Sequence, residues 1–372
     1  MKIIESLLSE IAKNQKSSHS SLNFIDLFCG CGGITQGFLD ASFNLLYGID
    51  HDQPSLDTFN RNFGQDKGLK LDLFDDNFIE SIKDKVDGRV VDVVVAGPPC
   101  QGFSLTGPRN FDDPRNKLYL AVFKMIQTFK PKAVVIENVK GMKSLYKGEI
   151  LDQVVQRFES LGYKVSEPSV LLAANYAVPQ MRERLFIIGV RNDYEEFVFP
   201  EPLTPSNKIS CKEAISDLPS RESEFGIESD NYTSNALSSY QKLMRMNASS
   251  LYNHVATKHT EMVKSVIKLV PEGKNHKALP PGVGESRKFN EAWTRYHSKK
   301  PSKTIDTGHR NHFHYKWDRV PTVRENARLQ SFRDDFIFTG PRTQQNKQVG
   351  NAVPPLLAYS LAKQIKKTIE KT

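Results

Sequence analysis

The chain has 372 residues, of which 38% are apolar and 25% charged, values typical of a soluble protein with one large domain and a smaller one. No apolar run approaches membrane-spanning length, and Glu5 and Glu10 interrupt the N-terminal apolar pattern where a signal peptide needs a continuous one. Four cysteines are too few for a disulfide framework, which favours a reducing, intracellular setting.

The net charge of +8 is concentrated in one stretch of the chain. Residues 231–316 contain fifteen Lys and Arg against five Asp and Glu, and seven of the nine histidines. A basic segment beside a near-neutral body is typical of proteins that bind a polyanion, most simply nucleic acid. A solvated basic face would have the same composition.

The N-terminal part predicts a helix and then a nucleotide-type site. Residues 1–21 read as a short amphipathic helix and a Ser-rich linker, to which we assign no function. Residues 23–28 predict a strand, which runs into the glycine turn 29–33 and a helix. Glycines in such a turn let the backbone approach a ligand closely. Thr35 stands where the dinucleotide fingerprint has its third glycine, which weakens a pyrophosphate interpretation.

Two acidic residues end the next two predicted strands. Asp50 follows the strand 45–49, twenty residues after Gly30, and a carboxylate there can accept both hydroxyls of a ribose. Asp72 follows a strand around 69–71 and suits an adenine amino group. Ribose and adenine contacts without a diphosphate clamp favour S-adenosylmethionine over NAD, although Asp is also a common turn residue.

A thiol follows a strand that is nearly all apolar. Residues 90–95 predict a buried parallel strand, and Gly97 and two prolines end it directly before Cys100. Ligands bind at the carboxyl ends of such strands, so Cys100 is predicted to be a nucleophile rather than a small buried hydrophobe.

Further polar residues are predicted to join this edge. Glu137 follows the strand 133–136, which should neighbour the strand leading to Cys100. A hairpin of 164–172 with 184–190 follows, and Arg182 and Arg184 are expected to point the same way and to grip a phosphate or a base carbonyl.

The last third of the chain is harder to assign. A helix is expected near 262–269, and cations mixed with aromatics, including Arg295 and Tyr296, are typical of phosphate-contacting surfaces. We interpret the nearby histidines 309, 312 and 314 as polar surface or DNA contacts, because no carboxylate or cysteine completes a metal site. Residues 321–330 predict a helix start with a Thr322–Glu325 capping box, and 348–355 a tight loop that comes back onto the cofactor.

Taken together, the motifs resemble those of the DNA (cytosine-5) methyltransferase family, of the bacterial restriction-modification type, over nearly the whole chain. The resemblance rests on six segments in the family's order, Asp26–Gly33, Gly97–Ser104, Glu137–Val139, Gln180–Arg184, Arg324–Glu325 and Gly350–Asn351. Asp50 stands where many members have Glu, and His51 where an aromatic often stands.

The resemblance implies an α/β fold, with an S-adenosylmethionine-dependent, Rossmann-like methyltransferase sheet and a smaller target-recognition domain. The implied domains are an N-terminal extension (1–21), a catalytic and cofactor domain (22–200), a basic, DNA-binding target-recognition domain (201–300) and a return to the catalytic domain (301–372).

The resemblance also implies functional residues, and no metal. The implied catalytic residues are Cys100, Glu137, Arg182 and Arg184. Those implied to bind S-adenosylmethionine are Phe28, Gly30, Gly32, Gly33, Asp50, His51, Asp72, Leu73, Pro98, Asn351 and Ala352. Those implied to bind DNA are Gln101, Ser104, Thr106 and Arg115.

In the implied reaction, Cys100 adds to C6 of cytosine, and C5 then takes the methyl group of S-adenosylmethionine. Glu137, protonated or sharing a proton with N3, stabilises the negative charge that develops toward N3, while Arg182 and Arg184 hold the base carbonyl and orient Glu137. The base must leave the duplex, because C5 and C6 are reached from the ring faces, and 101–107 is the loop expected to close behind it. We expect duplex DNA as partner, a monomer in the bacterial cytoplasm, and a restriction endonuclease that acts separately.

Three alternatives stay open at this point. An RNA cytosine-5 methyltransferase could use the same scaffold, although the long basic insert after Arg191 favours DNA. A catalytically inactive DNA-binding relative is disfavoured because Cys100 and Glu137 are both present, and an NAD-linked enzyme is disfavoured by Thr35.

Overall fold

The computed structural model describes residues 2–16, 22–75, 77–99, 117–283, 291–308 and 311–370. The chain divides into two compact units, each described by itself. We call Lys13–Leu172, Glu183–Glu201 and Ala358–Thr372 the sheet unit, and Met1–Ala12, Ala173–Arg182 and Pro202–Leu357 the loop-rich unit.

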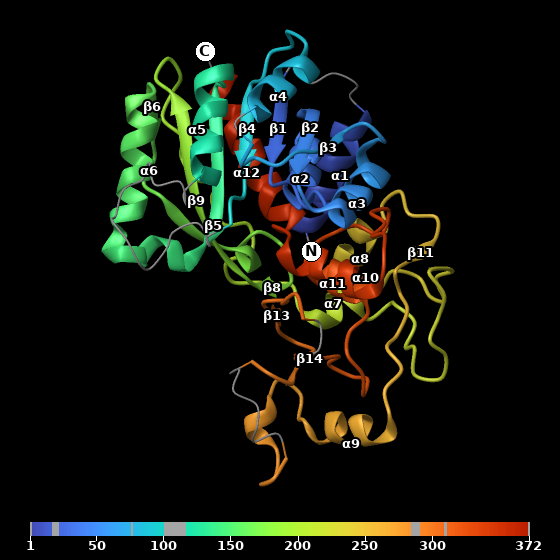
Figure 1. Ribbon diagram of the computed structural model, residues 1–372. Coiled ribbons are helices and arrows are strands. Elements are labelled where there is room, and N and C mark those ends of the chain that lie inside the picture. Colours follow the sequence, from blue (N-terminus) through green and yellow to red (C-terminus); the bar gives the residue numbers. More distant parts are fainter. Residues whose placement is uncertain are drawn as a thin grey trace. The chain divides into compact units, whose positions relative to one another are not determined.

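Eight strands of the described residues form the sheet of the sheet unit (Figure 1). Their order is β3-β2-β1-β4-β5-β9-β6, and β7 also pairs with β9. The first five in this order are parallel, whereas β9 runs antiparallel to β5, β6 and β7. The strands are β1 Asn23–Leu27, β2 Asn44–Asp50, β3 Gly68–Lys70, β4 Val93–Ala96, β5 Ala133–Val139, β6 Tyr163–Val165, β7 Ser169–Leu172 and β9 Glu183–Arg191.

Helices pack against this sheet because their apolar stripes match its apolar strands. β4 is buried at every position, and α5 contacts both β4 and α4, while α3 packs on β2 and β3. The helices are α2 Gly33–Asp40, α3 Gln53–Phe63, α4 Phe78–Val86, α5 Lys117–Phe129, α6 Glu149–Ser160 and α12 Pro355–Ile369. Strand order reverses between β1 and β4, the switch point where ligands of open α/β sheets bind.

Most predicted elements of this unit are confirmed, with two local differences. β4 begins at Val93 rather than at Val90, which is 65% exposed. Asp92 interrupts the apolar run, and its carboxylate accepts the backbone N–H of Asn23. The predicted hairpin strand 164–172 is interrupted before Ser169, since Pro168 cannot donate to the ladder, and two short strands pair with β9 in its place.

The loop-rich unit has short strands and several helices. Its strands are β8 Gln180–Met181, β10 Ser229–Asp230, β11 Leu251–Tyr252, β12 Thr294–Arg295, β13 Ser302–Lys303 and β14 His312–Phe313. Its helices are α7 Cys211–Ile215, α8 Ser239–Met244, α9 Glu261–Leu269, α10 Val323–Leu329 and α11 Arg342–Asn351. The N-terminal helix α1 spans Lys2–Lys16 and buries Ile4, Leu7 and Ile11, as its amphipathic pattern predicts.

Helix α10 organises part of the loop-rich unit. The Thr322 hydroxyl accepts the N–H of Glu325 and the Glu325 carboxylate accepts the N–H of Thr322, which confirms the predicted capping box. α10 packs against α7 and α11, so residues 301–357 belong to the same compact unit as 202–300. From the sequence we expected 301–372 to return to the catalytic domain, so the two divisions of the chain differ. No helix among the described residues is long and apolar enough to cross a membrane.

Candidate active site

The turn after β1 is built around left-handed backbone. Phe28, Gly30 and Gly32 have φ values of 60°, 53° and 98°. Gly32 is required for a second reason, because an added Cβ would lie 2.2 Å from a ring carbon of Phe63. Gly33 then begins α2, so the sequence prediction of strand, glycine turn and helix is confirmed.

Asp50 ties this turn to the end of β2. Its carboxylate accepts the N–H groups of Gly30 (2.8 Å), His51 (2.7 Å) and Asp52 (2.9 Å). A carboxylate has about four acceptor positions, so these bonds leave about one for a ligand hydroxyl. The Asp50 side chain is 11% exposed, whereas the neighbouring His51 side chain is 82% exposed. Contact of Asp50 with a ribose stays a prediction, for which the structure leaves about one acceptor position.

Asp72 lies beyond the end of the neighbouring strand. β2 and β3 are parallel, with Asp50 opposite Lys70 in the register, so Asp50 and Asp72 lie at the same edge of the sheet. One oxygen of Asp72 accepts the N–H of Phe74 at 2.9 Å, while the residue stays exposed and Leu73 is buried. The edge thus offers an exposed carboxylate that an amino group could contact.

Asp26, within β1, is a buried carboxyl that begins the first family-like segment but was assigned no role of its own. It is 1% exposed and one of its oxygens accepts the hydroxyl of Thr35 at 2.6 Å. Burial raises the pKa of Asp26 from 3.8 to about 7, although the Thr35 hydrogen bond opposes the rise, and the charge of Asp50 adds to it. An acidic residue inside an otherwise apolar strand was the signal that could have marked it.

Asp26 makes the stability of the protein depend on pH. Because its folded pKa is raised, its protonated form favours the folded state below pH 3.8, and this contribution is lost as the pH rises to about 7. In urea unfolding followed from pH 4 to pH 8, we expect Asp26→Asn to remove this part of the decline. Asp57→Asn, on the exposed face of α3, should leave the pH profile unchanged. Identical profiles for wild type and Asp26→Asn would contradict the expectation.

The ends of β4 and β5 bring the nucleophile segment and Glu137 to one edge. Ala96 pairs with Ile136 in the parallel register, which confirms that the Glu137 strand neighbours the strand leading to Cys100. A Cβ built on Gly97 would lie 3.4 Å from Oε2 of Glu137, so the carboxylate faces the start of the Gly-Pro-Pro turn. Cys100 itself, and the predicted DNA contacts Gln101, Ser104, Thr106 and Arg115, lie outside the described residues.

Arg184 on β9 holds the carboxylate of Glu137. Its Nε lies 2.8 Å from Oε1 of Glu137, and the two side chains are 15% and 13% exposed. The antiparallel register of β5 with β9 places Arg184 opposite Val139, diagonally across from Glu137. A partly buried acid with a fixed guanidinium partner can bind a polar ring edge while keeping one orientation.

Arg182 is held by backbone carbonyls of the loop-rich unit, to which it belongs. It is 1% exposed and donates to the carbonyls of Gly350 at 2.8 Å and Ile305 at 3.3 Å. We expected Arg182 and Arg184 to point at one base or phosphate, but these hydrogen bonds direct the Arg182 guanidinium elsewhere. Arg182 therefore supports backbone at the end of α11.

The predicted tight loop at Gly350 and Asn351 is wrong, because both residues form the last turn of helix α11. The helix is polar and lacks apolar periodicity, and it ends shortly before Pro354 and Pro355. Gly350 is required by packing, since a Cβ would lie 2.6 Å from the carbonyl oxygen of Asp306. Asn351 is exposed, and the carbonyl of the capping residue Ala352 accepts the side chain of Gln330.

Asn138 lies in the family-like segment Glu137–Val139, but we assigned it no role of its own from the sequence. It is buried, and its Nδ2 donates to the carbonyl of Pro98 at 2.9 Å. Pro98 is itself buried and precedes Cys100 by two residues, so Asn138 holds the backbone at Pro98, at the start of the nucleophile segment. The signal in the sequence was its place in that segment, next to Glu137.

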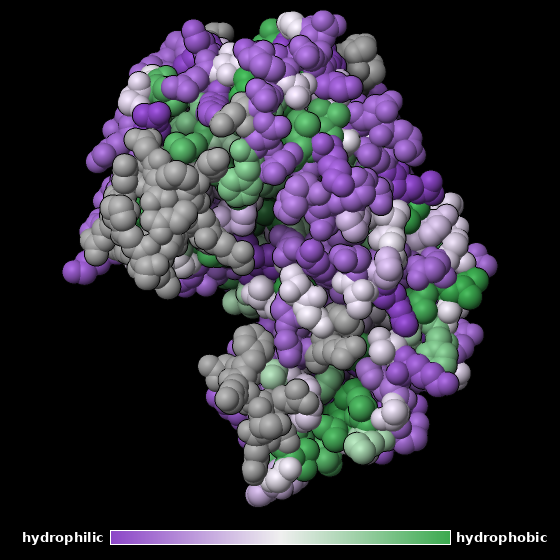
Figure 2. Space-filling model, in the orientation of Figure 1, coloured by the Kyte–Doolittle hydropathy of each residue, from purple (hydrophilic) through white to green (hydrophobic). Residues whose placement is uncertain are grey.

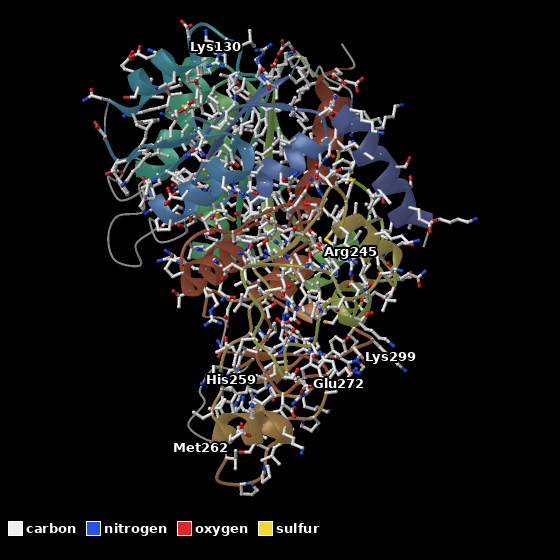
Figure 3. All side chains as sticks on the ribbon, turned by 90° about the vertical axis from the view of Figure 1, so that its right-hand side faces the viewer. Lys130, Arg245, His259, Met262, Glu272 and Lys299 are labelled. Atoms are coloured by element: carbon white, nitrogen blue, oxygen red, sulfur yellow. The ribbon has the colours of Figure 1, made fainter. Side chains whose placement is uncertain are left out.

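The basic stretch 231–316 contains both exposed and buried cations. Lys274 and Lys299 are exposed, whereas Arg295 and Tyr296 are buried, which corrects their interpretation as phosphate contacts. Arg295 instead donates to the carbonyls of Ile267 (2.6 Å) and Val270 (2.7 Å) and so caps α9. Figure 3 shows Lys299 among the side chains of this part. Figure 2 shows hydrophobic side chains gathered over α9.

The histidines of this stretch are also less exposed than expected. His312 and His314 are 4% and 1% exposed, so they are not surface contacts, while His309 lies outside the described residues. Burial lowers the pKa of His314 to about 3, so this ring stays neutral. Within the described ranges, no group of three or more His, Cys, Asp or Glu side chains is placed to hold a metal ion.

Comparisons with known proteins agree with this geometry. The family model described as C-5 cytosine-specific DNA methylase matches residues 22–367. The chain is 38% identical to Type II methyltransferase M1.HphI of Haemophilus parahaemolyticus, over 93% of this chain and 87% of that protein. It is 35% identical to Type II methyltransferase M.DdeI of Desulfomicrobium norvegicum, over 92% of this chain and 88% of that protein.

Solved structures agree on the fold. A DNA modification methyltransferase assigned to an E. coli prophage superposes with a TM-score of 0.74 at 24% identity, over 94% of this chain and all of that one. A DNMT2 variant of Spodoptera frugiperda superposes with a TM-score of 0.62 at 14% identity, over 93% of this chain and 99% of that one. The predicted α/β fold, with the sheet of S-adenosylmethionine-dependent methyltransferases, is confirmed.

Proposed function

This chain belongs to the C-5 cytosine-specific DNA methylase family and is a DNA cytosine-5 methyltransferase, and we propose that it acts at specific DNA sites through a covalent bond between Cys100 and C6 of a flipped-out cytosine. One observation supports this most: the Glu137 carboxylate, held by Arg184, lies against Gly97 at the start of the segment that carries Cys100. An acid and a thiol at neighbouring strand ends suit addition to an electron-poor ring.

The chemistry needs the thiol because C5 of cytosine is a weak nucleophile. A thiolate at Cys100 forms a bond to C6, and the ring electrons move toward C5 and N3. C5 then bonds to the methyl group as the methyl–sulfur bond of S-adenosylmethionine breaks, and the electron pair of that bond stays on the donor sulfur. A base removes the proton from C5, and the bond between the Cys100 sulfur and C6 breaks, which releases the thiolate. The base has to leave the duplex first, because C5 and C6 are attacked from the ring faces.

Glu137 and Arg184 act at the N3 side of the ring, opposite C6, to which the thiolate adds. Glu137 shares a proton with N3 and so stabilises the negative charge that develops there, while Arg184 keeps the Glu137 carboxyl group in one orientation and contacts the base carbonyl. Arg182 acts at a distance, through the backbone of Gly350, and we assign it to support rather than to base contact.

The family implies S-adenosylmethionine, which supplies an electrophilic methyl group on sulfur. We propose that the backbone of the turn from Phe28 to Gly33 and the carboxylates of Asp50 and Asp72 contact it, as their places at the switch point allow. The other residues proposed to contact it are His51, Leu73, Pro98, Asn351 and Ala352.

The substrate proposal is duplex DNA read at a specific sequence. Gln101, Ser104, Thr106 and Arg115 are proposed to contact DNA at the flipped base, and the stretch 231–316 to contact the surrounding duplex. Protection of that site from a separate restriction endonuclease is the proposed biological role. It rests on the Type II names of the similar methyltransferases.

Expression in a host that lacks cytosine methylation tests this proposal. Bisulfite sequencing should show one recurring methylated site for the wild type and none for Cys100→Ser, while calorimetry should show unchanged S-adenosylmethionine binding. Methylation by Cys100→Ser would remove the nucleophile assignment. Methylation of tRNA but not of duplex DNA by the wild type would favour the RNA alternative.

Salt dependence tests the basic stretch as the DNA surface. Log affinity decreases with log salt, and this slope becomes less steep by about 0.9 for each phosphate that the protein no longer neutralises. The double variant Lys274→Gln with Lys299→Gln should therefore make the slope less steep by up to about 2. The control pair Lys85→Gln and Lys130→Gln changes exposed lysines of the sheet unit and should leave the slope unchanged. Equal slopes for both pairs, measured by fluorescence anisotropy, would argue against 231–316 as the DNA surface.

A further inference from the structure

Three buried side chains form a hydrogen-bonded row at the edge that carries the active site. Nδ2 of Asn138 donates to the hydroxyl of Tyr119 at 2.6 Å as well as to the carbonyl of Pro98. The Tyr119 hydroxyl lies 3.1 Å from the sulfur of Met142. Tyr119 and Met142 are each 1% exposed and Asn138 is 4% exposed, so water does not replace these partners.

The carboxamide orientation is determined by its third bond. Oδ1 of Asn138 accepts the N–H of Val139 at 2.8 Å, which leaves Nδ2 to face Pro98 and Tyr119. An amide nitrogen has two hydrogens, and the two acceptors use one each. The Tyr119 hydroxyl, which accepts from Asn138, donates its own hydrogen to the sulfur of Met142. Each member of the row thus sets the direction of the next.

The two acceptors of Asn138 lie on opposite sides of one segment of the sequence. Pro98 precedes residues 100–116 and Tyr119, in the first turn of α5, follows them. One side chain of β5 therefore joins the chain just before the segment to the chain just after it. A phenylalanine at position 119 would fill the same space but would leave one Asn138 hydrogen without its acceptor.

We propose that Tyr119 is a positioning residue for methyl transfer: its hydroxyl orients Asn138 on the Pro98 carbonyl and so helps to place Cys100. The proposal rests on the proposed function, in which Cys100 is the nucleophile. It differs from a purely structural role, in which the hydroxyl adds to stability and nothing more. Attack geometry is sensitive to small displacements, and a shift of about 1 Å can lower a rate by about 100-fold.

The sheet unit offers a matched control in Tyr163. This tyrosine is 3% exposed, and its hydroxyl donates at 2.6 Å to the carbonyl of Pro131, away from the active-site edge. Tyr119→Phe and Tyr163→Phe each remove one buried hydroxyl from the same unit. A purely structural role predicts lower thermal stability and wild-type rates for both variants.

Single-turnover methyl transfer to genomic DNA separates the two roles. We expect Tyr119→Phe to lower the rate constant by about 10- to 100-fold with unchanged S-adenosylmethionine affinity, and Tyr163→Phe to keep the wild-type rate. Covalent capture by duplex DNA containing 5-fluorocytosine, which blocks loss of the C5 substituent, should slow in parallel for Tyr119→Phe. Wild-type rates of transfer and capture for Tyr119→Phe would overturn the proposal.

A second variant keeps the test decisive if Tyr119→Phe folds poorly. Asn138→Ala should lower the same rate constant, and Tyr119→Phe added to it should lower the rate no further, because the hydroxyl acts through Asn138. A wild-type rate for folded Asn138→Ala would equally overturn the proposal. Failure of the proposed function is distinct: in that case Cys100→Ser would methylate DNA whatever Tyr119→Phe does.

Discussion

Replacing Glu137 with glutamine is expected to slow methyl transfer by about 100-fold or more. The substitution keeps the size of the side chain and its place at the end of β5, but it removes the charge that Arg184 binds at 2.8 Å. It also removes the acid that would share a proton with N3 when the thiolate adds to C6. Single-turnover transfer of labelled methyl groups to DNA measures the effect on the chemical step.

Glu183→Gln is the matched control for this prediction. Glu183 is next to Arg184 in sequence, but its carboxylate is 44% exposed and pairs with Lys140 at 3.0 Å. Exposed ion pairs contribute little, so the same chemical change there should leave the rate and the stability nearly unchanged. If both variants transferred methyl groups at the wild-type rate, Glu137 would have no part in the chemistry.

Replacing Arg328 with methionine is expected to destabilise the loop-rich unit by about 3–5 kcal/mol. Arg328 on α10 is fully buried and binds both oxygens of Asp334, at 2.9 Å and 2.6 Å, and one oxygen of Asp217. Burial alone would raise the pKa of Asp334, but the charge and hydrogen bonds of Arg328 outweigh it and lower that pKa. Methionine would leave buried Asp334 without its main partner and would take one of two arginine partners, Arg328 and Arg245, from buried Asp217.

Urea unfolding followed by tryptophan fluorescence measures this loss. Trp293 and Trp317, the chain's two tryptophans, both belong to the loop-rich unit. Lys264→Met is the control, because it breaks an exposed ion pair with Glu261 in the same unit and should cost about 1 kcal/mol or less. Equal midpoints for the two variants would show that the buried network does not contribute to stability.

Arginines illustrate the limit of sequence reasoning for this chain. We expected Arg182 to contact a base or phosphate and Arg295 to contact phosphate, and we assigned Arg328 no role. In the structure each of the three is buried against backbone carbonyls or carboxylates. Their partners come from distant parts of the chain: Arg182 contacts Gly350, and Arg328 contacts Asp217. Composition counts such residues as surface charge, because it contains no information on which cations are paired inside.

The sequence by itself determined the places of the parallel strands of the sheet, the glycine turn and the neighbouring strand ends that lead to Glu137 and to the nucleophile segment. Each of these follows from local apolar runs and from the rule that parallel strands end at one edge. Only the tertiary structure decided that Asp26 is buried, that Arg184 holds Glu137 while Arg182 binds backbone, and that Asn138 joins Pro98 to Tyr119. The physical reason is that burial and hydrogen-bond partners depend on packing between segments far apart in sequence, which no local pattern specifies.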